Sequence, residues 1–110
     1  DSSLDTRSYP LLMAQEVCRI VNQAAHVQAE VEWPNDIILS GKKLGGILVE
    51  QVCQGDAVKA ILVGVGLNIN QDSFKPPITH SAISLKNETG ITYEKELFVE
   101  ALTLGLYRLL

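Results

Sequence analysis

Three short segments of the sequence combine glycine or proline with polar side chains at the ends of predicted strands, a pattern that suits ligand binding. The first is Trp33–Asp36, where a strand that ends at a proline is followed by Asn35 and Asp36. Their side chains are able to hydrogen-bond a ligand at the edge of a sheet. The alternative is an Asx turn after the proline, in which these side chains bond only the backbone.

The second segment places two lysines directly before two glycines and an apolar strand. Gly45 and Gly46 cost conformational entropy in a strand, so they indicate close approach of a flat ligand or another backbone. Lys42 and Lys43 precede them, and an ammonium at this surface would neutralise a carboxylate or phosphate. Because strand side chains alternate, Lys43 is expected on the face of Gly45 and Ile47. The alternative is a solvated hairpin lysine.

The third segment, Gly64–Asn70, follows the most apolar run of the chain. Gly64 and Gly66 leave room beside the backbone for a nucleobase or a sugar, and Asn68 offers both a donor and an acceptor. The segment is not a dinucleotide-binding fingerprint, because the third glycine is missing and no capped helix follows. The alternative is a tight exit from the strand.

Hydrophobic periodicity predicts the elements that position these segments. Apolar residues at intervals of three and four predict an amphipathic helix over Leu11–Ala25. Alternation predicts a strand over 27–33, and the runs 37–39 and 43–52 predict a hairpin. The run Ala57–Val65 is expected to be the central strand of the sheet, because both of its faces are apolar.

After these strands the sequence loses its periodicity. Residues 66–80 form a predicted loop of a length usually reserved for function or disorder. A short helix is predicted over 81–88 and closed by Gly90, and Thr92 is the expected cap of a final helix. The expected fold class is α+β, with one domain over residues 1–110.

Length and composition exclude several classes of protein. The chain has 110 residues, of which 46% are hydrophobic and 20% charged, as in globular domains. Its formal net charge of -4 disfavours nucleic-acid binding, which depends on clustered Lys and Arg. No apolar run approaches the ~20 residues of a membrane-spanning helix. Cys18 and Cys53 lack metal-ligand spacing and are expected to be buried, reduced thiols of a cytoplasmic protein.

Taken in order, these segments resemble the motif series of one enzyme family. WPND at 33–36, KKLGGILVE at 42–50, GVGLNIN at 64–70 and AISL at 82–85 look like the biotin protein ligase catalytic domain of the BPL/LPL family. The four motifs stand in the family's order over this part of the chain. The resemblance covers the second half of that domain.

The resemblance implies a fold and an activity. The fold is a mixed or antiparallel sheet flanked by helices, class II synthetase-like and here incomplete. The activity uses ATP and Mg²⁺ to convert the biotin carboxylate to biotinyl-AMP, and biotin is then transferred to a lysine of a biotin carboxyl carrier protein. Because strands expected upstream would cover a sheet edge, self-association as a homodimer is a further expectation.

The resemblance also assigns roles to residues near biotin. Lys43 resembles the catalytic lysine that contacts biotin and the reacting carboxylate and phosphate. Gly45 and Gly46 resemble the strand beside biotin. Ser84 resembles a motif serine that caps or supports the site. Removal of a group such as Lys43 typically raises the barrier by about 3 kcal/mol, because it stabilises charge that develops in the transition state.

On the nucleotide side, Asn35 and Asp36 resemble polar residues of the adenylate site, with Trp33 as the aromatic residue beside it. Asn68 resembles the asparagine near adenine or metal. No metal ligand is certain from the resemblance, and Asp36 and Asn68 are the candidates near Mg²⁺.

Two residues depart from the family pattern. Glu32 stands where the family usually has a lysine, which reverses a charge near the phosphates, and Ile83 replaces a usual threonine. The family's Gly/Arg-rich loop is expected upstream of this sequence, so the chain is interpreted as a fragment that binds weakly or is inactive alone. Two other hypotheses stay open: a truncated binding or interaction module without turnover, and a relative that ligates lipoate or another acid.

Overall fold

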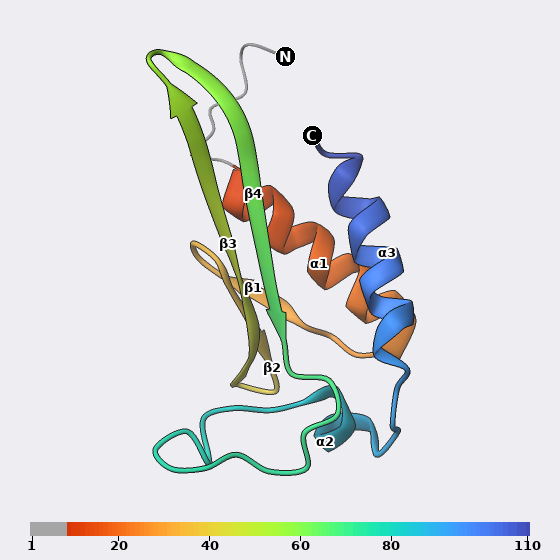
Figure 1. Cartoon of the computed structure of the whole chain (residues 1–110). Helices are drawn as coiled ribbons and strands as arrows, with labels where there is room; N and C mark the ends of the chain where they lie inside the picture. Colours follow the sequence, from red (N-terminus) through yellow and green to blue (C-terminus); the bar gives the residue numbers. More distant parts are fainter. Residues whose placement is uncertain (1–8) are drawn as a thin grey trace.

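Four antiparallel strands form the sheet, in the order β1-β2-β3-β4 (Figure 1). The computed structural model describes residues 9–110. The strands are β1 (Glu30–Glu32), β2 (Asp36–Leu39), β3 (Lys42–Gln54) and β4 (Ala57–Leu67). Gly41 and Gly55 adopt left-handed backbone conformations in the turns that precede β3 and β4. The sheet is therefore a meander, and the expectation of an antiparallel sheet flanked by helices is confirmed.

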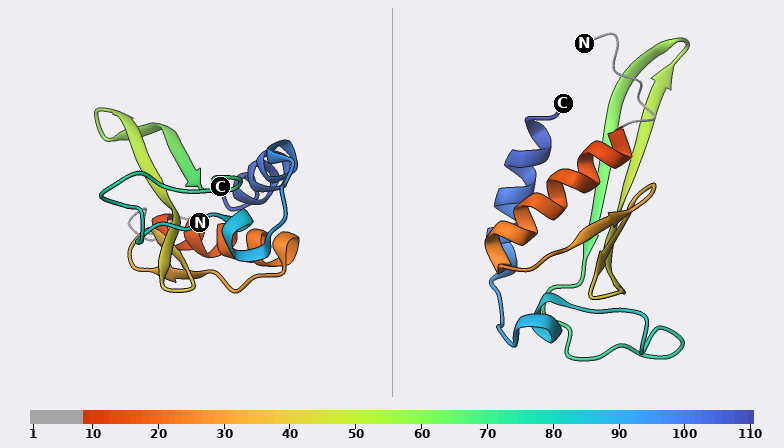
Figure 2. Two further views of the ribbon diagram at one scale, coloured as in Figure 1. Left: turned by 90° about the horizontal axis from the view of Figure 1, so that it is seen from below. Right: turned by 180° about the vertical axis from the view of Figure 1, so that it is seen from behind.

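Two helices cover one face of this sheet. Helices α1 (Tyr9–Ala25) and α3 (Lys95–Tyr107) lie side by side there, while α2 (Leu85–Thr89) lies at one end (Figures 1 and 2). Gly105 allows α3 to approach α1, because a Cβ atom at this position would lie 2.6 Å from Cδ1 of Ile20. The fully buried apolar side chains come from α1, the strands and α2, and include Met13, Val17, Val21, Ile37, Leu44 and Leu85. None of the helices within residues 9–110 has the length and apolar character needed to span a membrane.

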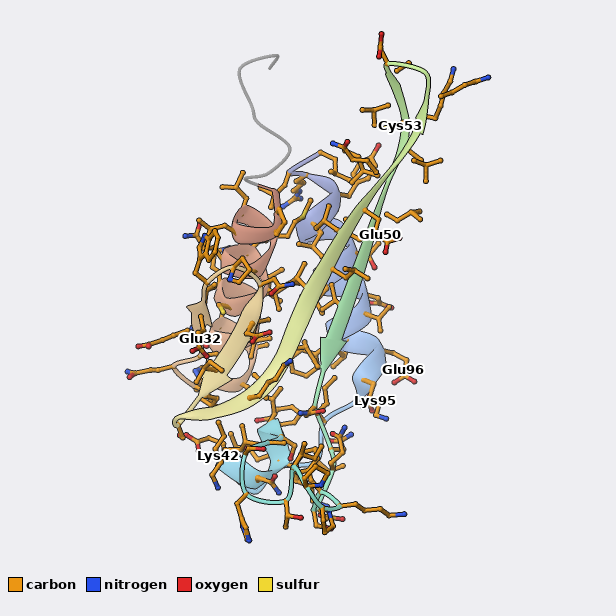
Figure 3. The ribbon with its side chains drawn as sticks, turned by 90° about the vertical axis from the view of Figure 1, so that its left-hand side faces the viewer. Glu32, Lys42, Glu50, Cys53, Lys95 and Glu96 are labelled. Atoms are coloured by element: carbon orange, nitrogen blue, oxygen red, sulfur yellow. The ribbon has the colours of Figure 1, made fainter. Side chains whose placement is uncertain are left out.

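The hairpin of β3 and β4 extends well beyond the helices (Figure 1). Side chains from Glu50 to Ala60 are all exposed, because none of the helices within residues 9–110 covers this end of the hairpin. Cys53 lies near the tip (Figure 3) and is exposed, so the expectation that it is buried is wrong. Cys18, on α1, is buried as predicted.

The long loop after β4 and the short helix α2 are held by caps. Ser84 is the N-cap of α2 and forms a capping box with Asn87, so the expectation that it acts as a cap is confirmed. Gly90 ends the helix in the left-handed conformation, as predicted. The predicted helix over 81–88 is too long at its start, because the backbone of residues 81–83 pairs with Lys43 instead.

The strand predicted over 27–33 is shorter in the structure. The backbone amide and carbonyl of Ala29 are hydrogen-bonded by the side chain of Asn22, at 2.7 and 3.1 Å, so they do not pair with a strand. Only Glu30–Glu32 joins the sheet as β1, and Trp33 lies in the following turn.

Two further expectations are corrected by the sheet order and by α3. Strand β4 lies at the edge of the four-stranded sheet and is not central; its exposed face carries Leu62 and two glycines. Thr92 does not cap α3, because the N-cap is Glu94, whose side chain makes no capping hydrogen bond.

Candidate functional site

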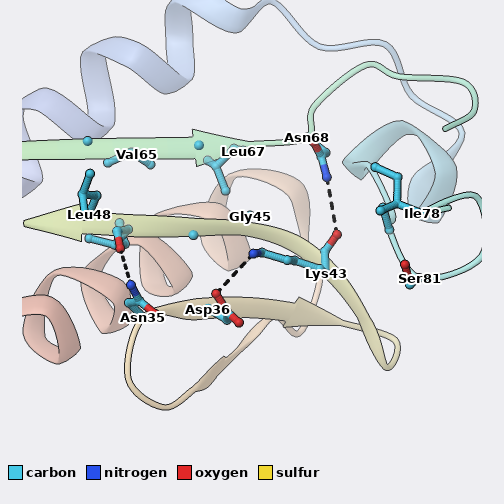
Figure 4. Close-up of a pocket in the computed structure, with 15 residues that line it drawn as sticks. Asn35, Asp36, Lys43, Gly45, Leu48, Val65, Leu67, Asn68, Ile78 and Ser81 are labelled. Atoms are coloured by element: carbon cyan, nitrogen blue, oxygen red, sulfur yellow. Dashed lines mark hydrogen bonds and ion pairs between the residues drawn. The ribbon is translucent and has the colours of Figure 1, made fainter. Parts of the chain in front are cut away.

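The floor of the candidate site is a glycine surface on the face of the sheet away from α1 and α3. It belongs to a pocket of about 830 Å³ formed over β3, β4 and the following loop (Figure 4). Gly46 and Gly66 are opposed in the β3–β4 register, and Gly64 lies beside them opposite Leu48. A Cβ atom at Gly66 would meet nothing within 4 Å, so the missing side chain leaves space for a ligand.

Gly45 has a different reason to be glycine. A Cβ atom there would overlap the carbonyl oxygen of Gly66 on the neighbouring strand. Close approach of β4 therefore excludes a side chain at Gly45, whereas at Gly66 the backbone is open. Of the two alternatives raised for the glycines of the second segment, backbone approach accounts for Gly45, while the open space at Gly66 agrees with the room for a nucleobase or sugar expected in the third segment.

Lys43 and Asp36 stand at one side of this floor and form an ion pair. The Lys43 Nζ and Asp36 Oδ1 atoms are 3.4 Å apart (Figure 4), and their side chains are 57% and 41% exposed. An ion pair this exposed contributes at most about 1 kcal/mol, because water screens both charges. The Lys43 ammonium is therefore free to exchange Asp36 for an anionic group of a ligand at small cost.

A β-bulge decides which face Lys43 occupies. The β2–β3 register places Ile37 opposite Gly45 but Ile38 opposite Lys43, which leaves the buried Leu44 as the extra residue. Cε of Lys43 lies 3.9 Å from the position of a Cβ atom on Gly46. The expectation that Lys43 and Gly45 lie on the same face of the strand is therefore wrong. The expectation that the Lys43 side chain faces the pocket agrees with the structure.

The backbone of Lys43 is fixed by the loop on the other side of the pocket. Its amide donates to Ser81 O at 2.9 Å, and its carbonyl accepts from the amide of Ile83 at 3.0 Å. This parallel bridge, centred on Ala82, holds the candidate catalytic residue from a segment about forty residues away in sequence. The loop is therefore part of the site.

The two asparagines have distinct surroundings. Asn35 bonds β3 twice, because its backbone oxygen accepts from the amide of Ile47 at 2.9 Å and its Nδ2 donates to Ile47 O at 2.8 Å. Asn35 thus anchors the turn that presents Asp36. Asn68 follows β4, and its Nδ2 donates to Lys43 O at 3.4 Å (Figure 4).

The structure brings together most of the predicted site residues. The pocket is lined by Asn35, Asp36, Lys43, Gly45, Gly46 and Asn68. Trp33 is not among the lining residues and is 77% exposed in the turn after β1. Lys42 and Glu32, both labelled in Figure 3, are also absent from the pocket lining, and Glu32 faces Asp36 in the β1–β2 register.

Some lining residues have no role assigned from the sequence. Among them, Leu48 projects from β3, and Ile78 and Ser81 come from the long loop. The only signal for the loop residues was the unusual length of the loop itself. For Leu48, strand alternation is misleading, because the bulge in β3 moves its side chain to the face that lines the pocket.

The donor set bears on whether Mg²⁺ fits this pocket. No group of three or more His, Cys, Asp or Glu side chains gathers within residues 9–110. Among the described residues, Asp36 is the single carboxylate that lines the pocket. Mg²⁺ is commonly held by one or two carboxylates together with substrate phosphates, so Asp36 fits as one ligand of a metal that arrives with a nucleotide.

Comparison with known proteins identifies the family. Residues 2–68 match the family described as the biotin/lipoate A/B protein ligase family. The chain belongs to this family. The bifunctional ligase/repressor BirA of Bacillus subtilis is 37% identical over 87 residues, covering 77% of this chain and 27% of BirA. The biotin--[acetyl-CoA-carboxylase] ligase of Paracoccus denitrificans is 36% identical over 76 residues, covering 66% of this chain and 31% of the relative.

Solved structures of biotin/lipoate protein ligase family members share the fold. The biotin protein ligase of Aquifex aeolicus in complex with biotin and ATP superimposes with a TM-score of 0.80 at 24% identity, over 94% of this chain and 43% of that one. The Leishmania major biotin protein ligase in complex with biotinyl-5-AMP gives a TM-score of 0.70 at 22% identity, over 94% and 48%. The chain therefore spans under half the length of these structures and about a quarter of BirA.

Proposed function

We propose that this chain is the part of an ATP-dependent biotin--protein ligase that holds biotinyl-AMP, in the pocket over β3 and β4. The observation that carries the proposal is the Lys43 ammonium, which stands beside a glycine floor and has only a weak partner in Asp36. A flat ring fits on a surface without side chains, and a mobile ammonium fits an acyl phosphate beside it. Membership of the ligase family supports this reading.

Lys43 would act on the charge of the reacting groups. In adenylation an oxygen of the biotin carboxylate attacks the α-phosphorus of ATP, and the bond from that phosphorus to pyrophosphate breaks. Negative charge grows on the phosphoryl oxygens, and an ammonium held nearby stabilises it more in the transition state than in the substrate. The fixed backbone of Lys43 limits where its Nζ atom can reach, which favours one geometry for the attack.

Asp36 and Asn35 would serve the nucleotide side. Asn35 anchors the turn through its two hydrogen bonds to Ile47, so that Asp36 faces the pocket. Asp36 would hold Mg²⁺ bound to ATP, and the metal would neutralise part of the phosphate charge. Trp33 stays a candidate aromatic neighbour of the adenylate that the pocket geometry does not include.

The second half of the proposed reaction needs a protein partner. The amine of one lysine on a biotin carboxyl carrier protein attacks the acyl carbon of biotinyl-AMP, and AMP leaves as the amide bond forms and the amine gives up its proton. The pocket is open to solvent at the exposed Lys43, so a carrier lysine has a route to the acyl group. We place this reaction in the cytoplasm, in keeping with two free cysteines.

Binding by the chain tests the proposal. Isothermal titration with hydrolysis-resistant analogues of biotinyl-AMP and lipoyl-AMP, and with AMP, should give tighter binding for the biotinyl compound than for AMP alone. Tighter binding of the lipoyl compound would move the chain to the lipoate branch of the family. Equal affinity for all three compounds, or no binding by a folded chain, would contradict the proposed pocket.

A further inference from the structure

The orientation of the Asn68 side-chain amide is set by its neighbours. Its Nδ2 atom lies 3.4 Å from the carbonyl oxygen of Lys43. A backbone carbonyl only accepts hydrogen bonds, so the nitrogen of the amide must face it and the oxygen must point the other way. The Asn68 side chain lines the pocket (Figure 4).

The oxygen of this amide is occupied by a second side chain. Gln71 donates from Nε2 to Oδ1 of Asn68 at 3.1 Å. The backbone of Gln71 is itself fixed, because its carbonyl oxygen accepts from Ser84 Oγ at 2.6 Å and from Asn87 Nδ2 at 3.2 Å. Ser84 is fully buried, so a well-anchored cap holds Gln71 in place.

We propose that Gln71 is a positioning residue that fixes Asn68 as a hydrogen-bond donor toward an acceptor atom of the adenylate. This rests on the proposed function of the pocket. The amide nitrogen has two N–H groups, of which one is used by Lys43, and no other residue within 9–110 accepts from the second. The oxygen has two acceptor positions, and Gln71 uses one of them. Asn68 therefore offers its second N–H to a hydrogen-bond acceptor of the adenylate, while Asp36 is the carboxylate that would hold Mg²⁺.

Isosteric replacement of Gln71 separates this role from simple packing. In Gln71→Glu the new carboxylate only accepts hydrogen bonds, so it repels the Asn68 oxygen and attracts the nitrogen. The Asn68 amide then lies between two acceptors, the new carboxylate and the Lys43 carbonyl, and should lose its single orientation, so its ¹⁵N–¹H signals in the unliganded chain should follow the titration of the carboxylate at pH ~4. Unmoved Asn68 signals across this titration would overturn the proposal, whether or not the chain binds an adenylate.

Binding provides the second readout. Affinity for the biotinyl-AMP analogue should fall about tenfold in Gln71→Glu, and less in Gln71→Lys, which keeps a donor. Ser73→Glu adds the same charge to the exposed loop without a contact to Asn68 and controls for charge alone. In an Asn68→Ala background, Gln71→Glu should cause no further loss, because the two residues act as one unit.

The outcomes distinguish the two proposals. Equal losses in Gln71→Glu and Ser73→Glu, a larger loss in Gln71→Lys, or an undiminished effect in the Asn68→Ala background would overturn the role of Gln71. If the unaltered chain binds no analogue, the proposed function fails, and the amide signals of Asn68 still decide the orientation.

Discussion

Lys43 combines a fixed backbone with a weakly held side chain. Its amide and carbonyl are bonded to Ser81 and Ile83, while its ammonium shares a solvent-screened contact with Asp36. A group that binds a charged substrate benefits from both properties, because its backbone is fixed in position and breaking the ion pair costs little free energy. The adjacent Lys42 is exposed and outside the pocket, which makes it a matched control.

The two cysteines give a prediction at the same scale. Burial, and secondarily the charge of Glu30, raise the pKa of the Cys18 thiol. The neutral buried thiol of Cys18 contributes to the free energy of unfolding at pH values below the ordinary thiol pKa of ~8.5. This contribution is lost as the pH rises through the higher pKa of the folded state. Between pH 8 and 10, the free energy of unfolding should fall more steeply in the unaltered chain than in Cys18→Ala, as measured by urea titration.

Thiol labelling gives an independent check of this assignment. Cys53 is exposed near the tip of the β3–β4 hairpin and should react rapidly with a disulfide reagent in the folded chain. Cys18 should react only after unfolding. Two rapidly reacting thiols in the native chain would contradict the burial of Cys18.

At the scale of elements, the β3–β4 ladder makes two glycines non-equivalent. Gly45→Ala forces a Cβ atom onto the carbonyl oxygen of Gly66 and should lower the free energy of unfolding by about 3 kcal/mol. Gly66→Ala meets open space and should leave stability within about 1 kcal/mol, while it places a methyl group on the pocket floor. Thermal unfolding and titration with the adenylate analogue measure the two effects.

The two glycine variants test separate claims, close strand approach at Gly45 and ligand binding at Gly66. Gly66→Ala should weaken binding in a chain that remains as stable as the original. Undiminished binding in Gly66→Ala would mean that no ligand lies on this surface, and an unchanged melting temperature in Gly45→Ala would mean that β4 does not approach β3 as described.

The sequence predicts most elements because alternation and helical periodicity are local properties. The first helix, the β2–β3 hairpin and the stop of α2 at Gly90 follow from such local signals. Asn22 shortens the first strand through bonds to Ala29, a contact between residues seven positions apart that no periodicity reports. The bulge at Leu44 similarly places Lys43 on the opposite face of the strand from the one that alternation predicts. A single extra residue changes the face on which every following side chain lies.

The candidate site is predictable in its residue types but not in its assembly. Most of its members come from the three motif segments, whereas Ile78 and Ser81 reach it through a loop with no periodic signal. The hydrogen bonds from the loop to Lys43 depend on tertiary packing. The edge position of β4 is also a property of the whole sheet, and its apolar sequence alone suggested a central strand.

At the scale of the whole molecule, the chain presents apolar surface that its own elements do not cover. Strand β4 ends the sheet, helix α3 exposes Leu97, Val99, Leu104 and Tyr107, and Leu110 is exposed just beyond the helix. A groove between β4 and α3 is lined mainly by apolar residues. Exposed strand edges and apolar patches of this kind promote association.

Self-association of the chain follows from this surface. Sedimentation velocity should show species larger than the monomer as concentration rises, and the double variant Leu97→Glu, Leu104→Glu should shift the distribution toward monomer. Glu50→Gln, on the exposed part of the hairpin, is a control that leaves the apolar surface of α3 intact. A chain that stays monomeric at all concentrations would contradict this expectation.

Calorimetric titration of the chain and its Lys43→Ala and Lys42→Ala variants with a hydrolysis-resistant biotinyl-AMP analogue tests whether the pocket holds the adenylate through Lys43. Loss of a charge-assisted contact should weaken binding by at least about tenfold in Lys43→Ala, while Lys42→Ala should stay within about twofold. Equal affinities for the unaltered chain and Lys43→Ala, both folded, would contradict the claim that this pocket holds the adenylate.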